Sequence, residues 1–122
     1  MSHYHNTIRA QYDNDCDLAA RHNEIIENFA RMGQNSISAA AVALEKAEAA
    51  LTSAEESESL AFRGGAMIWN LEGKNHMLNA AGIRKNVWVL RAALGKADAA
   101  DLRREVGYIE ITDIIAAMAW AA

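Results

Sequence analysis

The feature that most constrains this chain is the regular spacing of apolar residues in its first half, within a sequence that contains no proline. From residue 8 to residue 32 one stripe recurs at steps of mostly three and four, and its members are Ile8, Tyr12, Leu18, His22, Ile25, Phe29 and Met32. Such steps place side chains on one face of a helix. Because proline breaks helix interiors, its absence permits long uninterrupted helices. We therefore expect a helix over residues 8–32, ended by Gly33.

The next segment, residues 36–62, carries a heptad pattern with alanine at one of its two seam positions. The larger residues are Ile37, Leu44 and Leu51, and the alanines are Ala40, Ala47, Ala54 and Ala61. Small residues along a seam let two helices approach closely. We expect an antiparallel pair formed by residues 8–32 and 36–62, with another subunit as the alternative partner of the alanine seam.

The second half of the chain is expected to add three shorter helices. Gly64 and Gly65 interrupt the pattern, and periodicity leaves open whether residues 66–71 form a strand or a helix. A helix is predicted over residues 76–94, a short one from Asp98, and a last one near the end of the sequence. The expected fold is a single mainly α domain spanning residues 1–122, with about five helices on the N-terminal antiparallel pair. One short β-ribbon at Tyr108–Thr112, where polar and apolar residues alternate, is an open alternative.

The last predicted helix is strongly apolar. Its stripe consists of Ile111, Ile114, Ile115 and Met118. A surface of this kind is unfavourable in water, so it must dock in the core or on a partner. Together with the alanine seam, it predicts self-association into a homo-oligomer.

The composition and the apolar runs of the chain indicate where in the cell it is expected to lie. Cys16 is the only cysteine, which excludes an internal disulfide and fits a reducing environment. The longest apolar run, Ile114–Ala122, is far shorter than the roughly 20 residues of a membrane-spanning helix. The first residues lack the basic region and apolar block of a secretory signal. We expect a small, soluble, cytoplasmic protein without membrane contact.

Charge is divided unevenly along the chain, although its formal net value is only −4. Residues 1–62 carry ten acidic and four basic side chains, whereas residues 63–104 carry eight basic and three acidic ones. The chain as a whole does not resemble a nucleic-acid binder, but its middle could be part of one.

Sequence motifs for metal binding or catalysis are weak in this chain. Asp13, Asp15, Asp17 and Glu24 match the acidic positions of an EF-hand calcium loop, but Leu18 stands where glycine permits the sharp turn. The histidines lack the spacing of a zinc site, and Cys16 lacks the context of a catalytic nucleophile. We expect no metal, no cofactor and no catalytic residue, and hence no enzyme.

The basic middle offers the best candidates for contact with a partner or ligand. Arg84, Trp88 and Arg91 are spaced to share one helix face, and tryptophan and arginine are the residue types that most often anchor interfaces. They can also stack on bases while their charges meet phosphates. Further candidate contacts from the same region are Trp69, Lys74 and Lys85. The structural alternative is that Trp88 lies half-buried at the edge of the core, covered by the two arginines.

Two short segments resemble a known family. His22, Glu24, Ile25 and Phe29, followed by residues 66–70 (Ala-Met-Ile-Trp-Asn), are similar to the two helical segments of small phage proteins that sequester cyclic oligonucleotide signals. The resemblance covers about ten positions, Gly64 and Gly65 interrupt the helix it requires, and residues 76–122 have no counterpart. It implies nucleotide binding.

Taken together, the sequence predicts a small non-catalytic protein that binds or inhibits a protein partner through its surface. The alternative is a nucleotide or nucleic-acid binder that uses the basic Trp/Arg face of residues 63–104, for example a phage-type protein that sequesters cyclic oligonucleotides.

Overall fold

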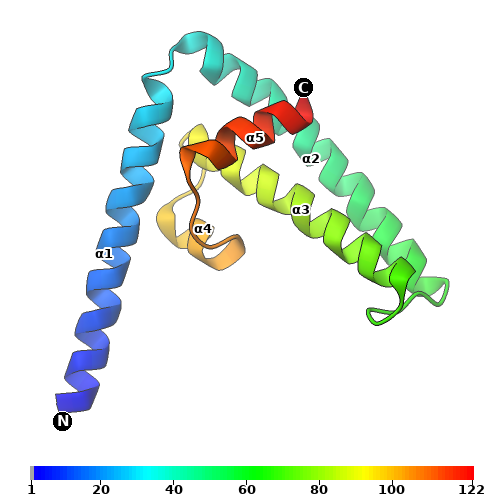
Figure 1. The fold of residues 1–122 in the computed structure, drawn as a ribbon, viewed down its shortest axis with the longest axis horizontal. Coiled ribbons are helices and arrows are strands. Elements are labelled where there is room, and N and C mark those ends of the chain that lie inside the picture. Colours follow the sequence, from blue (N-terminus) through cyan, green and yellow to red (C-terminus); the bar gives the residue numbers. More distant parts are fainter. Residues whose placement is uncertain (1) are drawn as a thin grey trace.

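The computed structural model describes the backbone of residues 2–122 and the side chains of residues 14–122. Within this range the chain forms five helices and no strand (Figure 1). They are α1 (Ser2–Ala30), α2 (Gln34–Arg63), α3 (Leu71–Ala93), α4 (Ala99–Glu105) and α5 (Ile111–Ala121). The mainly α fold with five helices is therefore confirmed.

The alanine seam of α2 packs against α3, which returns beside it as the second arm of a hairpin (Figure 1). On α2 the seam alanines Ala40, Ala47 and Ala54 are buried, as is Leu44. The facing stripe of α3 is buried as well, and its members are Ala80, Ile83, Val87 and Leu90. Over these residues the seam is thus closed inside the chain.

The predicted pairing of residues 8–32 with residues 36–62 needs correction, because α2 pairs with α3 instead. At Gly33 the backbone has a φ of 101°, a conformation that glycine adopts without strain, and the chain turns a corner there. Beyond the corner α1 diverges from α2 (Figure 1). Of the α1 stripe, His22, Ile25 and Phe29 are buried, while Met32 is exposed at the corner. The side chains of Ile8 and Tyr12 lie outside the described residues.

The expected β-ribbon is absent from the described chain. Residues 107–110 form an irregular connection, and α5 begins at Ile111. Ile109 is buried whereas Tyr108 and Glu110 are exposed, so the alternation reflects a segment that crosses the surface of the core. A strand needs a neighbour for its backbone hydrogen bonds, and no second extended segment lies beside this one. Residues 66–70, which the sequence left open, form a turn.

A single cluster of buried side chains receives residues from all five helices. From α1 comes Phe29, from α4 Leu102, and from α5 Ile114 and Ala117, all packed with the α2–α3 hairpin. The apolar stripe of α5 therefore docks in the core, although Ile115 stays exposed. None of the helices in residues 2–122 combines the length and the apolar character that crossing a membrane requires.

The close approach of α2 and α3 can be tested at Ala47, which is fully buried in the seam. We expect Ala47→Leu to lower the free energy of unfolding by about 1–3 kcal/mol, because added methylene groups force a packed interface apart. Ala49→Leu on the exposed face of α2 is the matched control, with a change within about 0.5 kcal/mol. Urea unfolding measures both variants. Equal stability of the two variants would contradict a tight α2–α3 seam.

Candidate functional site

The six contact residues expected from the sequence do not gather in one place. Trp69 and Lys74 lie at the free end of the α2–α3 hairpin, where the chain turns from one helix to the other. Arg84, Trp88 and Arg91 follow one face of α3 beside α2, and Lys85 points toward α5, where its Nζ lies 3.6 Å from Asp113.

The two arginines of the expected binding face are paired within the chain. Arg84 Nη2 lies 3.2 Å from Glu55 Oε1, and Arg91 donates from Nε and Nη2 to Glu48 Oε1, both at 3.3 Å. The two glutamates are seven residues apart on α2 and the two arginines seven apart on α3, so the pairs repeat once per heptad along an antiparallel hairpin. This arrangement fixes the register of the hairpin.

Trp88 lies half-buried at the edge of the core, as the structural alternative from the sequence predicts. It is partly buried and packs against the main core cluster. The Arg91 guanidinium lies over the indole, 4.8 Å from the ring centroid. Since Arg91 also binds Glu48, it covers the indole while its charge is compensated. An indole held in this way is poorly placed to stack on a base.

Many of the basic residues in segment 63–104 are therefore neutralised by ion pairs with acidic residues of other helices. Besides the two pairs of the hairpin, Lys85 binds Asp113 of α5, and Arg103 of α4 pairs with Asp15 of α1. Acidic residues of α1, α2 and α5 thus form ion pairs with basic residues of segment 63–104. The basic middle is a set of internal partners more than a surface for phosphates.

The pairing of α2 with α3 predicts a measurable coupling between Glu48 and Arg91. In a double-mutant cycle of Glu48→Ala and Arg91→Ala, we expect a coupling free energy of about 0.2–1 kcal/mol, as for other partly exposed pairs. It should shrink as salt is raised from low concentration to 1 M, because salt screens exposed charges. The cycle of Glu48→Ala with Lys96→Ala, a lysine without an ion pair to Glu48, is the control. Coupling of equal size in both cycles would refute a specific contact.

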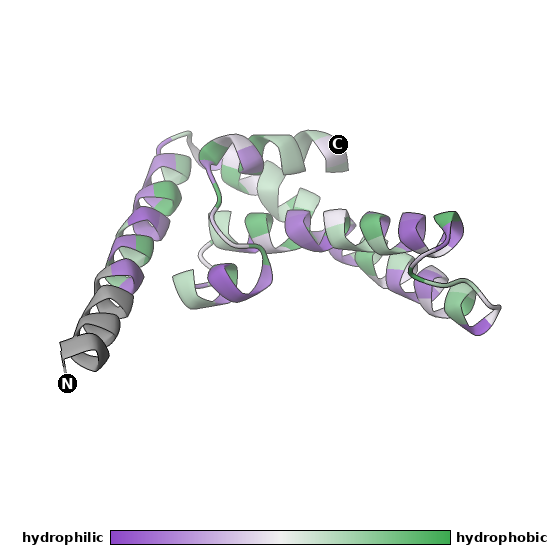
Figure 2. Ribbon diagram, turned by 60° about the horizontal axis from the view of Figure 1, so that its bottom comes forward, coloured by the Kyte–Doolittle hydropathy of each residue, from purple (hydrophilic) through white to green (hydrophobic). Residues whose placement is uncertain are grey.

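The free end of the hairpin exposes a group of large apolar side chains. We define the apolar tip as the exposed residues Leu60, Met67, Ile68, Trp69 and Leu71. Trp69 is 74% exposed and Leu71 is 75% exposed. Figure 2 shows hydrophobic ribbon at this end of the hairpin, far from α1 and α5. Exposed apolar groups of this kind mark interaction sites.

The turn that carries the tip is held by Asn70. This residue is the N-cap of α3, and its Oδ1 accepts hydrogen bonds from the backbone N–H of Gly73 at 2.8 Å and of Met67 at 3.3 Å. The backbone N–H of Asn70 in turn donates to the Met67 carbonyl at 3.1 Å. The sequence predicted a helix that begins at residue 76, but the cap is Asn70, so α3 begins about one turn earlier, at Leu71.

Gly73 completes the turn because any larger residue would collide with it. A Cβ atom at this position would lie 2.0 Å from the carbonyl oxygen of Met67, closer than any real contact. The backbone of the turn therefore packs directly on the first turn of α3. The apolar side chains of the tip are presented by a compact, hydrogen-bonded frame.

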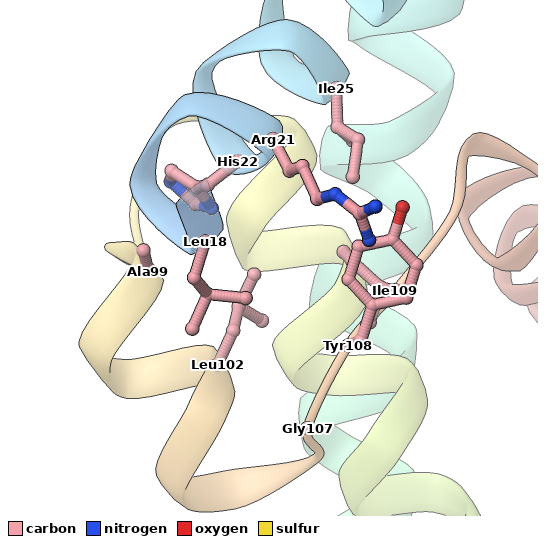
Figure 3. Close-up of a pocket in the computed structure, with 9 residues that line it drawn as sticks. All are labelled: Leu18, Arg21, His22, Ile25, Ala99, Leu102, Gly107, Tyr108 and Ile109. Atoms are coloured by element: carbon pink, nitrogen blue, oxygen red, sulfur yellow. The ribbon is translucent and has the colours of Figure 1, made fainter. Parts of the chain in front are cut away.

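A second feature lies at the other end of the molecule, where α1 meets the segment before α5. The guanidinium of Arg21 lies over the ring of Tyr108, 4.8 Å from its centroid (Figure 3). Beside this stack, residues of α1, α4 and the 107–109 segment line a small, partly open hollow of about 10 Å³, which has space for about one water molecule. Sequence analysis missed this contact, since the two residues are separated by most of the chain and neither belongs to a motif.

Two hollows flank the Arg21–Tyr108 stack, and both have acidic linings. One, of about 590 Å³, includes Asp17 and Glu24, and the other, of about 260 Å³, includes Glu24 and Glu110. Among the described residues that line them, Arg21 is the one cation, and it already covers Tyr108. This electrostatic setting opposes phosphate-bearing ligands. In the part of the chain whose side chains are described, no group of three or more potential ligands is placed to hold a metal ion.

The position of Tyr108 predicts a pH-dependent change. A hydrogen bond with Glu110 is the main cause that raises the pKa of the Tyr108 phenol, burial adds to it, and Arg21 opposes it. Because the folded pKa lies above the unfolded one, the stabilisation is complete below about pH 10 and is lost as pH rises through the folded pKa. In a Tyr4→Phe, Tyr12→Phe background, absorbance titration should give a pKa above 10 for Tyr108. Glu110→Gln should lower that pKa; an unchanged pKa would contradict the contact.

Comparison with known proteins adds no assignment, since no protein family model, no curated protein and no solved structure matches this chain. The segments that resemble phage sequestering proteins lie far apart in the fold. His22, Ile25 and Phe29 are buried in the core, whereas residues 66–70 form the turn of the hairpin and not a helix. The case for function therefore depends on the surfaces described above.

Proposed function

We propose that this chain is a non-catalytic protein-binding module, acting as a binding or inhibitory protein, whose contact surface is the apolar tip. The observation that carries the proposal is the combination of a compact hydrogen-bonded turn with highly exposed Ile68, Trp69 and Leu71. Leaving such side chains in water is unfavourable, and a preorganised turn loses little conformational entropy when it binds. Tryptophan is among the residues that contribute most to interfaces.

The charges around the tip favour a protein over a phosphate-rich partner. Arg63 and Lys74 are exposed near it, and Glu58 and Glu72 balance them. An anionic membrane or a nucleic acid is bound through clusters of uncompensated basic residues. The tip has an apolar centre with charges of both signs at its edge, which is the composition of a protein interface.

The alternative from the sequence, nucleotide or nucleic-acid binding by the Trp/Arg face, has less support. Arg84 and Arg91 are paired with glutamates, and Trp88 is partly buried beneath Arg91. Releasing these arginines toward phosphates would leave Glu48 and Glu55 without partners beside the ligand, at an electrostatic cost. Of the six residues suggested by sequence, Trp69 and Lys74 are therefore the ones we retain as contacts of the partner.

The proposal is tested by placing a photo-crosslinking amino acid at position 69 in the native host and identifying the attached protein. With that protein purified, Trp69→Ala should weaken binding about 30-fold or more, equivalent to about 2 kcal/mol. Gly73→Ala, which distorts the turn without removing a contact side chain, should also weaken binding. Met32→Ala, an exposed apolar residue far from the tip, is the matched control and should leave the affinity unchanged.

The same variants are also tested for binding to nucleotides and to anionic phospholipid vesicles. Binding of mono- or cyclic nucleotides that is abolished by Arg84→Ala together with Arg91→Ala, and is unaffected at the tip, would overturn the proposal in favour of the Trp/Arg face. Binding to anionic phospholipid vesicles that requires Trp69 would assign the tip to a membrane surface and would equally overturn it.

A further inference from the structure

An apolar groove lies between α2 and α5, away from every feature used above. It has a volume of about 490 Å³, within the range of pockets that bind small molecules or side chains. Its lining consists of Ala39, Val42, Ala43, Lys46, Met118, Ala119, Ala121 and Ala122. Small side chains form most of the walls, and Val42 is 54% exposed at the edge. Of the described residues that line it, Lys46 is the one that carries a charge.

The groove and the apolar tip have complementary properties. The tip presents bulky apolar side chains, led by Trp69, while the alanine-rich groove offers room for them. The tip also carries Glu72, exposed in the first turn of α3, next to Leu71. Among the residues with described side chains, neither Lys46 nor Glu72 forms an ion pair. An apolar centre with one opposite charge on each side is the pattern of a specific contact.

The tip cannot reach the groove of its own chain. Val42 and Leu60 lie on the same straight helix, α2, and the 18 residues between them correspond to about 27 Å at 1.5 Å per residue. The hairpin holds the two surfaces apart. A tip that enters this groove must therefore belong to another molecule.

We propose that the apolar tip of one chain docks in the α2–α5 groove of a second copy, with Glu72 of the incoming tip beside Lys46 of the receiving chain. This inference rests on the proposed function, because it names the partner of the same tip. Each chain would offer one tip and one groove, so the contact is heterologous and repeats head to tail. Such contacts produce closed rings or open filaments instead of simple two-fold dimers.

A mixing experiment tests this arrangement directly. Trp69→Ser removes the tip contact but leaves the groove intact, and Val42→Asp blocks the groove but leaves the tip intact. Both residues are exposed, so both variants should fold, as circular dichroism and thermal unfolding can verify. Analytical ultracentrifugation should show wild-type mass that grows with concentration beyond a dimer, and each variant alone should be a monomer. Mixed in equal amounts, the variants should form a 1:1 complex that grows no further, since one working tip and one working groove remain.

The charge pair gives a second, independent readout. Lys46→Glu should weaken assembly at least several-fold, and adding Glu72→Lys to the same chain should restore it, because the two charges are exchanged. Met32→Asp is the control for an added charge at an exposed apolar site outside both surfaces, and it should assemble like the wild type.

Three outcomes would overturn the inference. Oligomers that persist in Trp69→Ser would assign assembly to another surface, and oligomers that persist in Val42→Asp would indicate a symmetric contact between tips. Wild-type protein that is monomeric at 100 µM would exclude self-docking. In that last case, a different protein crosslinked through position 69 would still support the proposed function, so the two proposals can fail separately.

Discussion

The close packing of α2 on α3 is the contact on which the other parts of this molecule depend. Alanine at successive seam positions removes side-chain bulk between the helices, and Ile83, Val87 and Leu90 of α3 supply the apolar area that alanine lacks. One end of the resulting hairpin supports α5 and the buried turns of α1. The other end projects freely and carries the apolar tip (Figure 1). A single antiparallel contact thus separates a packed end from an exposed one.

Charge specifies this hairpin more than it stabilises it. Partly exposed ion pairs contribute little individually, but the two pairs, with the same seven-residue interval on each helix, form together in only one register of the antiparallel hairpin. Trp88 extends the same arrangement, since Arg91 reaches across its ring to Glu48. Blocks of opposite charge that lie far apart in a sequence can therefore be partners within one fold. Here they account for much of what first suggested a surface for phosphates.

The sequence predicted the helices well and their partners poorly. Periodicity located all five helices, and the burial of His22, Ile83 and Ile114 follows directly from it. It led us to expect α1 or another subunit as the partner of the alanine seam, whereas the partner is α3, which has an apolar stripe of equally suitable spacing. The cap at Asn70 was missed because it depends on Gly73, whose N–H it binds. The need for glycine at that position becomes clear only from its close approach to the Met67 carbonyl in the folded structure. Trp69 was predicted as a contact residue by its type, but its exposure depends on a turn that no periodicity describes. The Arg21–Tyr108 contact joins distant parts of the chain and left no trace in local sequence.

Gly73 has a consequence for how the tip tolerates change. The backbone of the turn is determined by Asn70 and by the missing side chain at residue 73, whereas the side chains of Ile68, Trp69 and Leu71 are mostly exposed to solvent. Substitutions at these three positions therefore have little effect on folding, while residue 73 admits only glycine. The residues that hold the turn and the residues that it exposes are therefore different members of one short segment. Such a turn could be redirected to a new partner by replacing its outward side chains alone, with the helices beneath it left unaltered.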